Sequence, residues 1–283
     1  MPEHSSSIEP VSLYVPHGER RLHLLDWAGD GQSTILFVHG GCANAHWWCH
    51  SARLLAGRYR VLALDLSGHG ESDTLPDGAY SLEGHRDDLV HVARSLDLRG
   101  FALVGHSFGG FVSLAAVPEL GDRLGTLTLV DSRGHIRPRA ARYLTALGKF
   151  PNPIYANRDD ALRAFQLLPR DSAAPAEVLS HVARHSIRRA VDGTWSLAFD
   201  RRALRAATVR EFAAEMSQLR QPTLLVRGAA SGALSARALA QLADEIPHAE
   251  AIEIDGAHHH VMLDRPGPFA RALDSFLLRA ARP

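Results

Sequence analysis

The sequence predicts an α/β protein with one doubly wound, mostly parallel central sheet and a helical insertion near the carboxyl ends of its strands. Short apolar runs alternate with segments of helical periodicity up to about residue 131 and again from residue 222. Residues 132–221 are instead rich in Arg and Ala and indicate several helices with no convincing strand. The predicted domains are therefore a core of residues 1–131 and 222–283 and a helical insertion of residues 132–221.

The predicted elements follow this alternation in order. Six apolar runs are expected to be strands: Val11–Val15, Arg21–Trp27, Thr34–His39, Arg60–Leu64, Phe101–Gly105 and Thr126–Asp131. From Thr34 onward these runs lack polar alternation, which is typical of a parallel sheet covered on both faces. Helices, which parallel strands need as crossovers, are expected at Ala45–Leu55, Leu82–Leu96 and Phe108–Pro118. The pattern resumes with strand Pro222–Arg227, helix Ala236–Glu245, strand Glu250–Asp255 and helix Pro266–Ala281.

The composition excludes several function classes. The 283 residues are 46% hydrophobic and 22% charged, as in ordinary globular proteins, and 31 basic residues balance 31 acidic ones. Neither nucleic acid nor an anionic membrane is therefore an expected partner. Residues 1–7 show no basic segment followed by an apolar run, as a signal peptide would. No later stretch of about 18 apolar residues could cross a bilayer. The two cysteines, Cys42 and Cys49, form no disulfide framework. We expect a soluble cytoplasmic protein.

The charge is uneven along the chain. Residues 132–220 contain 16 Arg and Lys against 8 Asp and Glu. This excess fits a solvated helical surface, and it also fits a basic lid over an anionic substrate. The sequence leaves both interpretations open.

A candidate nucleophile lies directly after an apolar strand. Residues 105–109 read Gly-His-Ser-Phe-Gly, a G-x-S-x-G pattern between a predicted strand and a predicted helix. The glycines are needed because the nucleophile sits on a strained strand-to-helix turn, where larger side chains would collide with neighbouring backbone. The pattern in this context predicts Ser107 as the nucleophile.

A glycine pair at the end of another buried strand predicts an oxyanion hole. Residues 39–42 read His-Gly-Gly-Cys. An oxyanion hole needs unobstructed backbone N–H groups, one from the residue after the nucleophile and one from this second loop. Phe108 and Gly41 are the candidates.

Together with residues 63–72, which read Ala-Leu-Asp-Leu-Ser-Gly-His-Gly-Glu-Ser, these motifs resemble the α/β-hydrolase superfamily, in the branch with a helical cap between strands six and seven. The resemblance extends from about Val11 to Leu277. It implies an α/β-hydrolase fold with a serine nucleophile. It also implies that Asp65 and His69 belong to a structural turn beside the active site.

The resemblance places the general base after the last strand. Residues 254–266 resemble the Gly-His element of the family, and the spacing to Pro266 selects His259, with His258 at the usual glycine position. Neighbouring side chains in a loop point different ways, so His258, His259 and His260 are not expected to share one metal ion. We expect His258 and His260 to pack around the site, and neither a metal nor a cofactor is predicted.

The third member of the expected triad is displaced. Most relatives place the acid on the loop after the seventh strand, and here residues 228–234 contain no carboxylate. Some relatives supply it from the end of strand six, where this chain has Asp131. A histidine base needs a partner at Nδ1, so Asp131 is the expected acid, the alternative being that it only anchors the entrance to the insertion.

Four further residues are candidates for substrate binding: Cys42, Trp47, Trp48 and His106. Both tryptophans follow the oxyanion loop and would line an apolar pocket, unless they pack in the core. Cys42 is interpreted as a small loop residue rather than a nucleophile, because nothing in the sequence pairs it with a base.

The leading functional hypothesis is a serine hydrolase that cleaves an ester, thioester, lactone or activated C–C bond of a small, largely apolar molecule. A cofactor-free dioxygenase, or a lyase or cyclase, would use His259 and Asp131 as a base without an acyl-enzyme. A hydrolase-fold binding protein with weak catalysis is the third possibility. The sequence does not predict an oligomeric state.

Overall fold

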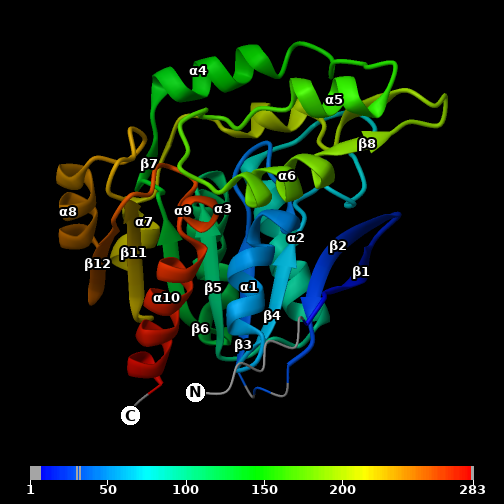
Figure 1. The fold of residues 1–283 in the computed structure, drawn as a ribbon. Helices are drawn as coiled ribbons and strands as arrows, with labels where there is room; N and C mark the ends of the chain where they lie inside the picture. The colour runs from blue at the N-terminus through cyan, green and yellow to red at the C-terminus, as the bar shows by residue number, and fades with distance from the viewer. Residues whose placement is uncertain (1–7, 30, 32, 282–283) are drawn as a thin grey trace.

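An eight-stranded sheet forms the centre of the computed structural model, which describes residues 8–29, 31 and 33–281 (Figure 1). The strand order is β1-β2-β4-β3-β5-β6-β11-β12. Strand β2 is antiparallel to both of its neighbours, and every other neighbouring pair in this sheet is parallel. The predicted doubly wound, mostly parallel sheet is confirmed.

The eight strands match the predicted ones, with ends shifted by at most two residues. They are β1 (Val11–His17), β2 (Arg20–Trp27), β3 (Thr34–Val38), β4 (Arg60–Leu64), β5 (Phe101–His106), β6 (Leu124–Val130), β11 (Thr223–Gly228) and β12 (Ala249–Ile254). Every residue of β5 and β11 is buried, and only the first residue of β3 and of β4 is not. Burial on both faces explains why these runs show no polar alternation.

Helices cover both faces of the sheet. One core contains side chains of α2 (Leu82–Ser95), α3 (Phe108–Leu120) and α8 (Ala236–Glu245). The other contains side chains of α1 (Cys49–Leu55) and α10 (Pro266–Ala280). The predicted helix over residues 45–55 divides into a 3₁₀ turn, η1 (Ala45–Trp48), and α1. Asn44 begins this turn, because its side chain accepts the His46 N–H at 3.1 Å.

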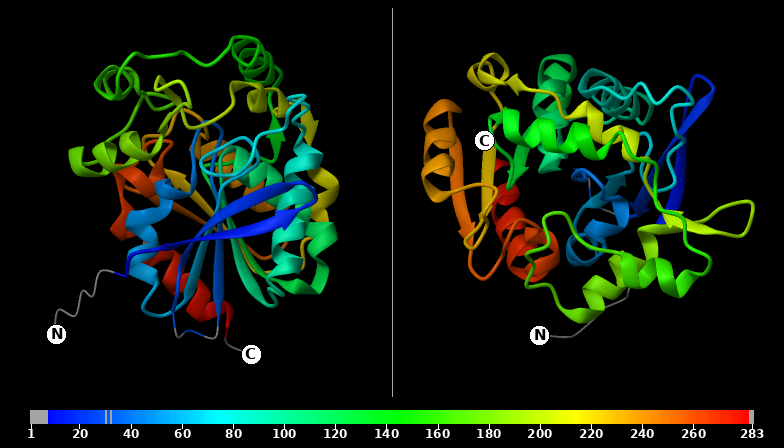
Figure 2. Two further views of the ribbon diagram at one scale, coloured as in Figure 1. Left: turned by 90° about the vertical axis from the view of Figure 1, so that its right-hand side faces the viewer. Right: turned by 90° about the horizontal axis from the view of Figure 1, so that it is seen from above.

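Most of the chain between β6 and β11 lies above the carboxyl ends of the strands (Figures 1 and 2), whereas its last helix packs beside the sheet against α3 and α8. It contains α4 (Pro138–Leu147), α5 (Arg158–Ala164), α6 (Ala176–His185), η3 (Arg201–Ala206) and α7 (Ala213–Ser217). The expectation of helices without strands was wrong, since β8 (Ile187–Arg189) pairs with β9 (Trp195–Leu197) and β7 (His135–Ile136) with β10 (Arg210–Glu211). Pairs of two or three residues are too short to give a sequence period. The proposed division into core and insertion domains stays a prediction.

The absence of a leader was predicted from residues 1–7, which lie outside the described residues. Within the part of the chain that the structure describes, no helix is both long and apolar enough to cross a bilayer.

Three buried histidines, His39, His69 and His85, lie close to one another. The ring centroids of His39 and His69 are 5.0 Å apart, and those of His69 and His85 are 6.3 Å apart. Burial lowers the pKa of all three imidazoles, and for His85 burial, His39 and Arg20 lower the pKa to about 3. Burial in the folded protein therefore disfavours the protonated form of all three rings.

We expect the free energy of unfolding to fall as the pH drops below about 6.5. Each ring has a folded-state pKa below its unfolded value, so the unfolded chain binds the proton first and stability is lost on acidification. For His85 the loss amounts to about 2 kcal/mol at about pH 5, from its folded pKa of about 3. Urea unfolding at about pH 7.5 and about pH 5 measures this loss, which should be smaller in His85→Phe. Equal losses in the wild type and in His85→Phe would show that the protonation of His85 does not cause the loss of stability.

Candidate active site

Ser107 occupies a strained turn between β5 and α3. Its backbone has φ 50° and ψ −115°, a conformation that side-chain-bearing residues rarely adopt. A Cβ atom at Gly105 would lie 2.5 Å from the carbonyl oxygen of Gly109, so a side chain there would block the close approach of strand and helix. The predicted glycine-flanked turn is present, and it raises Ser107 above the sheet edge.

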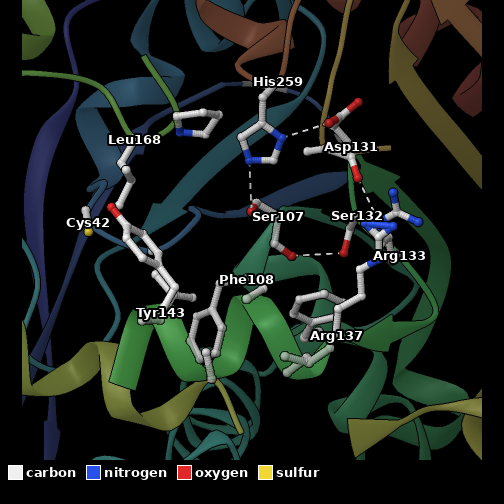
Figure 3. Close-up of a pocket in the computed structure, with 18 of the residues that line it drawn as sticks. Cys42, Ser107, Phe108, Asp131, Ser132, Arg133, Arg137, Tyr143, Leu168 and His259 are labelled. Atoms are coloured by element: carbon white, nitrogen blue, oxygen red, sulfur yellow. Dashed lines mark hydrogen bonds and ion pairs between the residues drawn. The ribbon is translucent and has the colours of Figure 1, made fainter. Parts of the chain in front are cut away.

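Ser107, His259 and Asp131 form one hydrogen-bonded line (Figure 3). Nε2 of His259 lies 3.0 Å from Oγ of Ser107, and Nδ1 lies 2.7 Å from the Asp131 carboxylate. A carboxylate only accepts, so Nδ1–H donates to Asp131 and Nε2 is left to accept the serine proton. The three residues follow β5, β6 and β12, whose carboxyl ends lie at one edge of the sheet.

The loop after β11 supports Asp131 instead of supplying an acid. The N–H of Gly228 donates to one carboxylate oxygen at 3.1 Å, and Oγ of Ser231 donates to the other at 2.6 Å. With His259 the buried carboxylate receives three hydrogen bonds. The sequence analysis did not single out Ser231. The feature that could have indicated it is a hydroxyl group in the one loop that lacks the expected carboxylate.

The backbone around His259 is held from two sides. Nε2–H of His106 donates to the carbonyl oxygen of His259 at 3.0 Å, and the Asp264 carboxylate accepts the His258 N–H at 2.6 Å. His106 is buried and does not line the cavity, so its predicted place in the substrate site was wrong. It lies behind the nucleophile turn because alternate side chains of β5 point to opposite faces of the sheet.

The candidate oxyanion groups face the cavity. Gly41 and Phe108 both line it, and no hydrogen bond among the described residues uses either N–H. His39 holds the neighbouring backbone, because its Nδ1–H donates to the Gly40 carbonyl at 2.7 Å while its Nε2 accepts the Leu66 N–H at 3.0 Å. Both N–H groups are therefore available to a ligand beside Ser107.

A cavity of about 470 Å³ opens above Ser107. Cys42 lies in its wall, as predicted, and burial raises the pKa of its thiol to about 12, which disfavours the thiolate at neutral pH. His69, expected to be purely structural, also reaches the wall. The insertion supplies much of the apolar lining: Ile136, Ala140, Tyr143, Leu144, Leu168 and Leu204.

Trp47 and Trp48 do not line this cavity, which corrects their predicted role. Trp48 is fully buried and stacks on Phe37 of β3 with ring centroids 4.4 Å apart. Trp47 packs edge-on against His260, and its indole N–H donates to Ser186 at 3.3 Å. The η1 turn directs both side chains inward, so they contribute buried apolar area.

Two arginines at the start of the insertion also line the cavity, and sequence reasoning did not single them out. Arg133 donates from Nε to the Ala233 carbonyl at 2.7 Å, and burial together with Arg137 lowers its guanidinium pKa. Among residues 8–29, 31 and 33–281, neither arginine forms an ion pair with a carboxylate. The two guanidinium groups therefore place positive charge in a lining that also contains the carboxylates of Asp131 and Asp171.

One group of site histidines is close enough to suggest metal binding. His106, His259 and His260 could each direct one nitrogen to a common point. Both ring nitrogens of His259 are already engaged by Ser107 and Asp131, and Nε2 of His260 bonds the Pro169 carbonyl at 2.9 Å. A metal ion here would have to break the hydrogen-bonded line.

Several known proteins resemble this chain over most of its length. An esterase of Mycobacterium tuberculosis is 29% identical, with 86% of this chain and 81% of the relative covered. A 2-(acetamidomethylene)succinate hydrolase of Mesorhizobium japonicum is 28% identical over 86% of this chain and 87% of the relative. The crystal structure of E-2-(acetamidomethylene)succinate hydrolase superposes with a TM-score of 0.83 and 25% identity, covering 95% of this chain and 99% of that one.

The family comparison agrees with the fold. The model of the alpha/beta hydrolase fold family matches residues 33–266, a range that includes Ser107, Asp131 and His259. The chain belongs to the α/β-hydrolase fold family.

Proposed function

We propose that this enzyme is a serine hydrolase that cleaves an ester, thioester, lactone or activated C–C bond of a small molecule, with Ser107, His259 and Asp131 as its triad. The observation that carries the proposal is the hydrogen-bonded line of 3.0 Å and 2.7 Å that ends in the cavity. The esterase and hydrolase relatives support the reaction class.

In the proposed mechanism each group has one step. Ser107 Oγ attacks the substrate carbonyl while Nε2 of His259 takes its proton, and Asp131 stabilises the imidazolium that forms. The N–H groups of Gly41 and Phe108 hold the developing oxyanion. The imidazolium then protonates the leaving group, and His259 next activates a water molecule that hydrolyses the acyl-enzyme and restores Ser107.

The substrate that best fits the cavity has an apolar body and an anionic group. The walls are mostly apolar, and Arg133 and Arg137 line the same space without an ion-pair partner among the described residues, although Asp171 and the hydrogen-bonded Asp131 line it as well. An arginine pair binds carboxylates by charge-assisted hydrogen bonds. The similarity to a hydrolase of a substituted succinate supports this substrate class.

The other hypotheses use the same residues with less support. A dioxygenase, lyase or cyclase would need only the His259–Asp131 pair, whereas Ser107 lies within hydrogen-bond distance of Nε2. A binding protein would need no such alignment. Oxygen uptake, or a product formed without added water, would favour a dioxygenase, lyase or cyclase. Tight ligand binding without turnover would favour a binding protein.

Labelling with a small fluorophosphonate tests the triad. We expect rapid, stoichiometric labelling of Ser107 in the wild type, none in Ser107→Ala, and much slower labelling in Asp131→Asn. Turnover of an activated ester by Asp131→Asn should fall by about 10⁴-fold, because the amide no longer holds the reactive tautomer. Intact-mass spectrometry and circular dichroism measure labelling and folding. A loss below about tenfold in a folded variant would contradict the role of Asp131.

The Ser231→Ala variant tests the support of Asp131. Removal of one hydrogen bond to the buried carboxylate should lower kcat by roughly three- to tenfold, corresponding to about 1 kcal/mol. KM should change little, because Ser231 does not line the cavity. Exposed Ser217, replaced by Ala, is the matched control. Unchanged kcat in Ser231→Ala would show that the hydroxyl does not position the acid.

An Arg137→Gln variant tests the substrate class with two esters that differ only in a distal carboxylate or carboxamide. We expect kcat/KM for the carboxylate ester to fall by roughly 10- to 100-fold, the value of a charge-assisted hydrogen bond. The carboxamide ester should be little affected. Arg139→Gln is the control, since Arg139 is exposed on α4 and does not line the cavity. Equal changes for both esters would exclude anion recognition by Arg137.

A further inference from the structure

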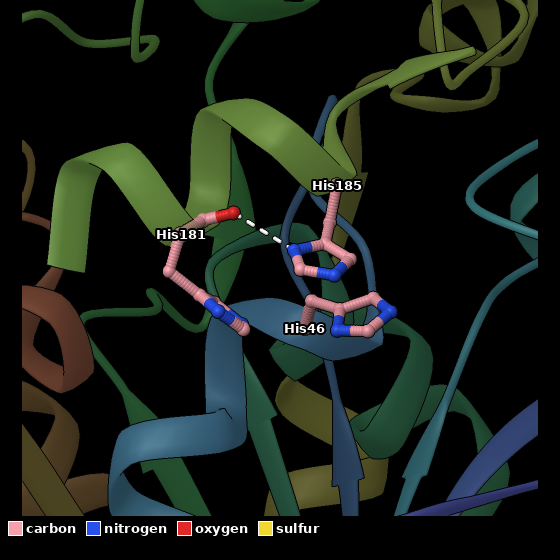
Figure 4. A group of neighbouring side chains, drawn as sticks. All are labelled: His46, His181 and His185. Atoms are coloured by element: carbon pink, nitrogen blue, oxygen red, sulfur yellow. Dashed lines mark hydrogen bonds between the residues drawn. The ribbon is translucent and has the colours of Figure 1, made fainter. Parts of the chain in front are cut away.

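A second histidine cluster lies where the insertion meets the core (Figure 4). His181 and His185 are four residues apart on α6, so they share one face of the helix. His46 reaches the same point from η1, and its ring lies 3.7 Å from that of His185, centroid to centroid. Each residue can offer one nitrogen, and these three nitrogens lie within 4.8 Å of one another. None of the three lines the substrate cavity.

In His185 and in His181, the Nε2 nitrogen makes no hydrogen bond to the described residues. Nδ1–H of His185 donates to the His181 carbonyl at 2.8 Å, which fixes the tautomer and leaves Nε2 as a lone pair. Nε2 of His181 is buried and has no hydrogen-bond partner among the described residues. A carbonyl that holds the far nitrogen of an imidazole is the usual support of a metal-binding histidine.

We propose that His46, His181 and His185 bind a divalent transition-metal ion, with Zn²⁺ as the best fit, between α6 and η1. Three imidazoles with no carboxylate select Zn²⁺, Co²⁺, Ni²⁺ or Cu²⁺ over Ca²⁺ and Mg²⁺, which need oxygen ligands. Tetrahedral zinc with bonds of about 2.0–2.1 Å places its nitrogens roughly 3.4 Å apart. The three nitrogens lie within 4.8 Å of one another, and the His46 and His185 rings are stacked with an interplanar angle of 21°, so metal binding requires these half-buried rings to turn about their side-chain torsions, with water as the fourth ligand.

The site would fasten the insertion to the core. The two parts already meet here, since the Asn44 amide donates to the His185 carbonyl at 2.8 Å. Asn44 follows the loop that contains Gly41, so a metal ion would brace the segment that presents a candidate oxyanion group. The proposal revises the sequence-based expectation of no metal, which considered only the three consecutive histidines at 258–260.

Zinc titration of the chelator-treated full chain tests the proposal without relying on catalysis. We expect one equivalent of Zn²⁺ to bind by isothermal titration calorimetry and to raise Tm. Co²⁺ should give the visible absorption of a tetrahedral site. In His181→Gln and His185→Gln the affinity should fall by roughly tenfold or more, and the Tm increase should disappear.

The control is His91→Gln, which removes a half-buried histidine of α2 outside the cluster. It should bind Zn²⁺ like the wild type. Circular dichroism without metal confirms that each variant is folded. Each single variant keeps two of the three histidines and can still bind the ion weakly, so the double variant His181→Gln/His185→Gln is also measured. Absence of Zn²⁺ binding to the wild type at micromolar concentration, or equal binding by the double variant, would overturn the proposal. Either result leaves the hydrolase proposal untouched, because no cluster residue contacts the cavity.

Discussion

The hydrogen bond between Nδ1 of His259 and the Asp131 carboxylate connects two segments that are 128 residues apart in the chain. It can form because β6 and β12 both flank β11, and the three strands run parallel and end at the same edge. The bond is buried, so the two groups retain their orientation without competition from water. The position of Nε2 beside Ser107 depends on this orientation.

The candidate acid, Asp131, lies one strand away from the place where most relatives are expected to carry the acid, and the β11 loop supports it there. The N–H of Asp131 continues the pairing with β11, donating to the Val226 carbonyl at 2.7 Å, so the side chain emerges beside the β11 loop. That loop donates the Gly228 N–H and the Ser231 hydroxyl to the carboxylate. A buried carboxylate needs such donors, because an unpaired charge in the interior is costly. The loop without an acid thus has a defined structural role.

The candidate base, His259, is also coupled to the insertion. On one side of His259, His260 donates from Nε2 to the Pro169 carbonyl at 2.9 Å. Further along, the Asp264 carboxylate accepts both the Ala173 N–H at 2.9 Å and the His258 N–H at 2.6 Å. The segment from His258 to Asp264 therefore contains the candidate base and also forms hydrogen bonds to the part of the insertion that lines the cavity. Movement of the insertion relative to the core would shift the position of His259, because these hydrogen bonds are short and partly buried.

The sequence by itself determined the sheet, its helices and the motifs around Ser107, Gly41 and His259. These features depend on local patterns, namely apolar runs, helical periods and glycines at a strained turn, which are independent of distant residues. It also indicated Asp131, because the only alternative loop contained no carboxylate. The order of the strands then brings these positions to one edge.

Only the tertiary structure decided which side chains surround the site. Local sequence does not reveal that Trp48 stacks on Phe37, that His106 bonds the His259 backbone, or that Arg133 and Arg137 face the cavity. The short strands of the insertion and the meeting of His46 with α6 likewise depend on contacts between distant segments. A sequence pattern specifies which face of an element is buried, whereas the partner on that face is set by packing of the whole chain.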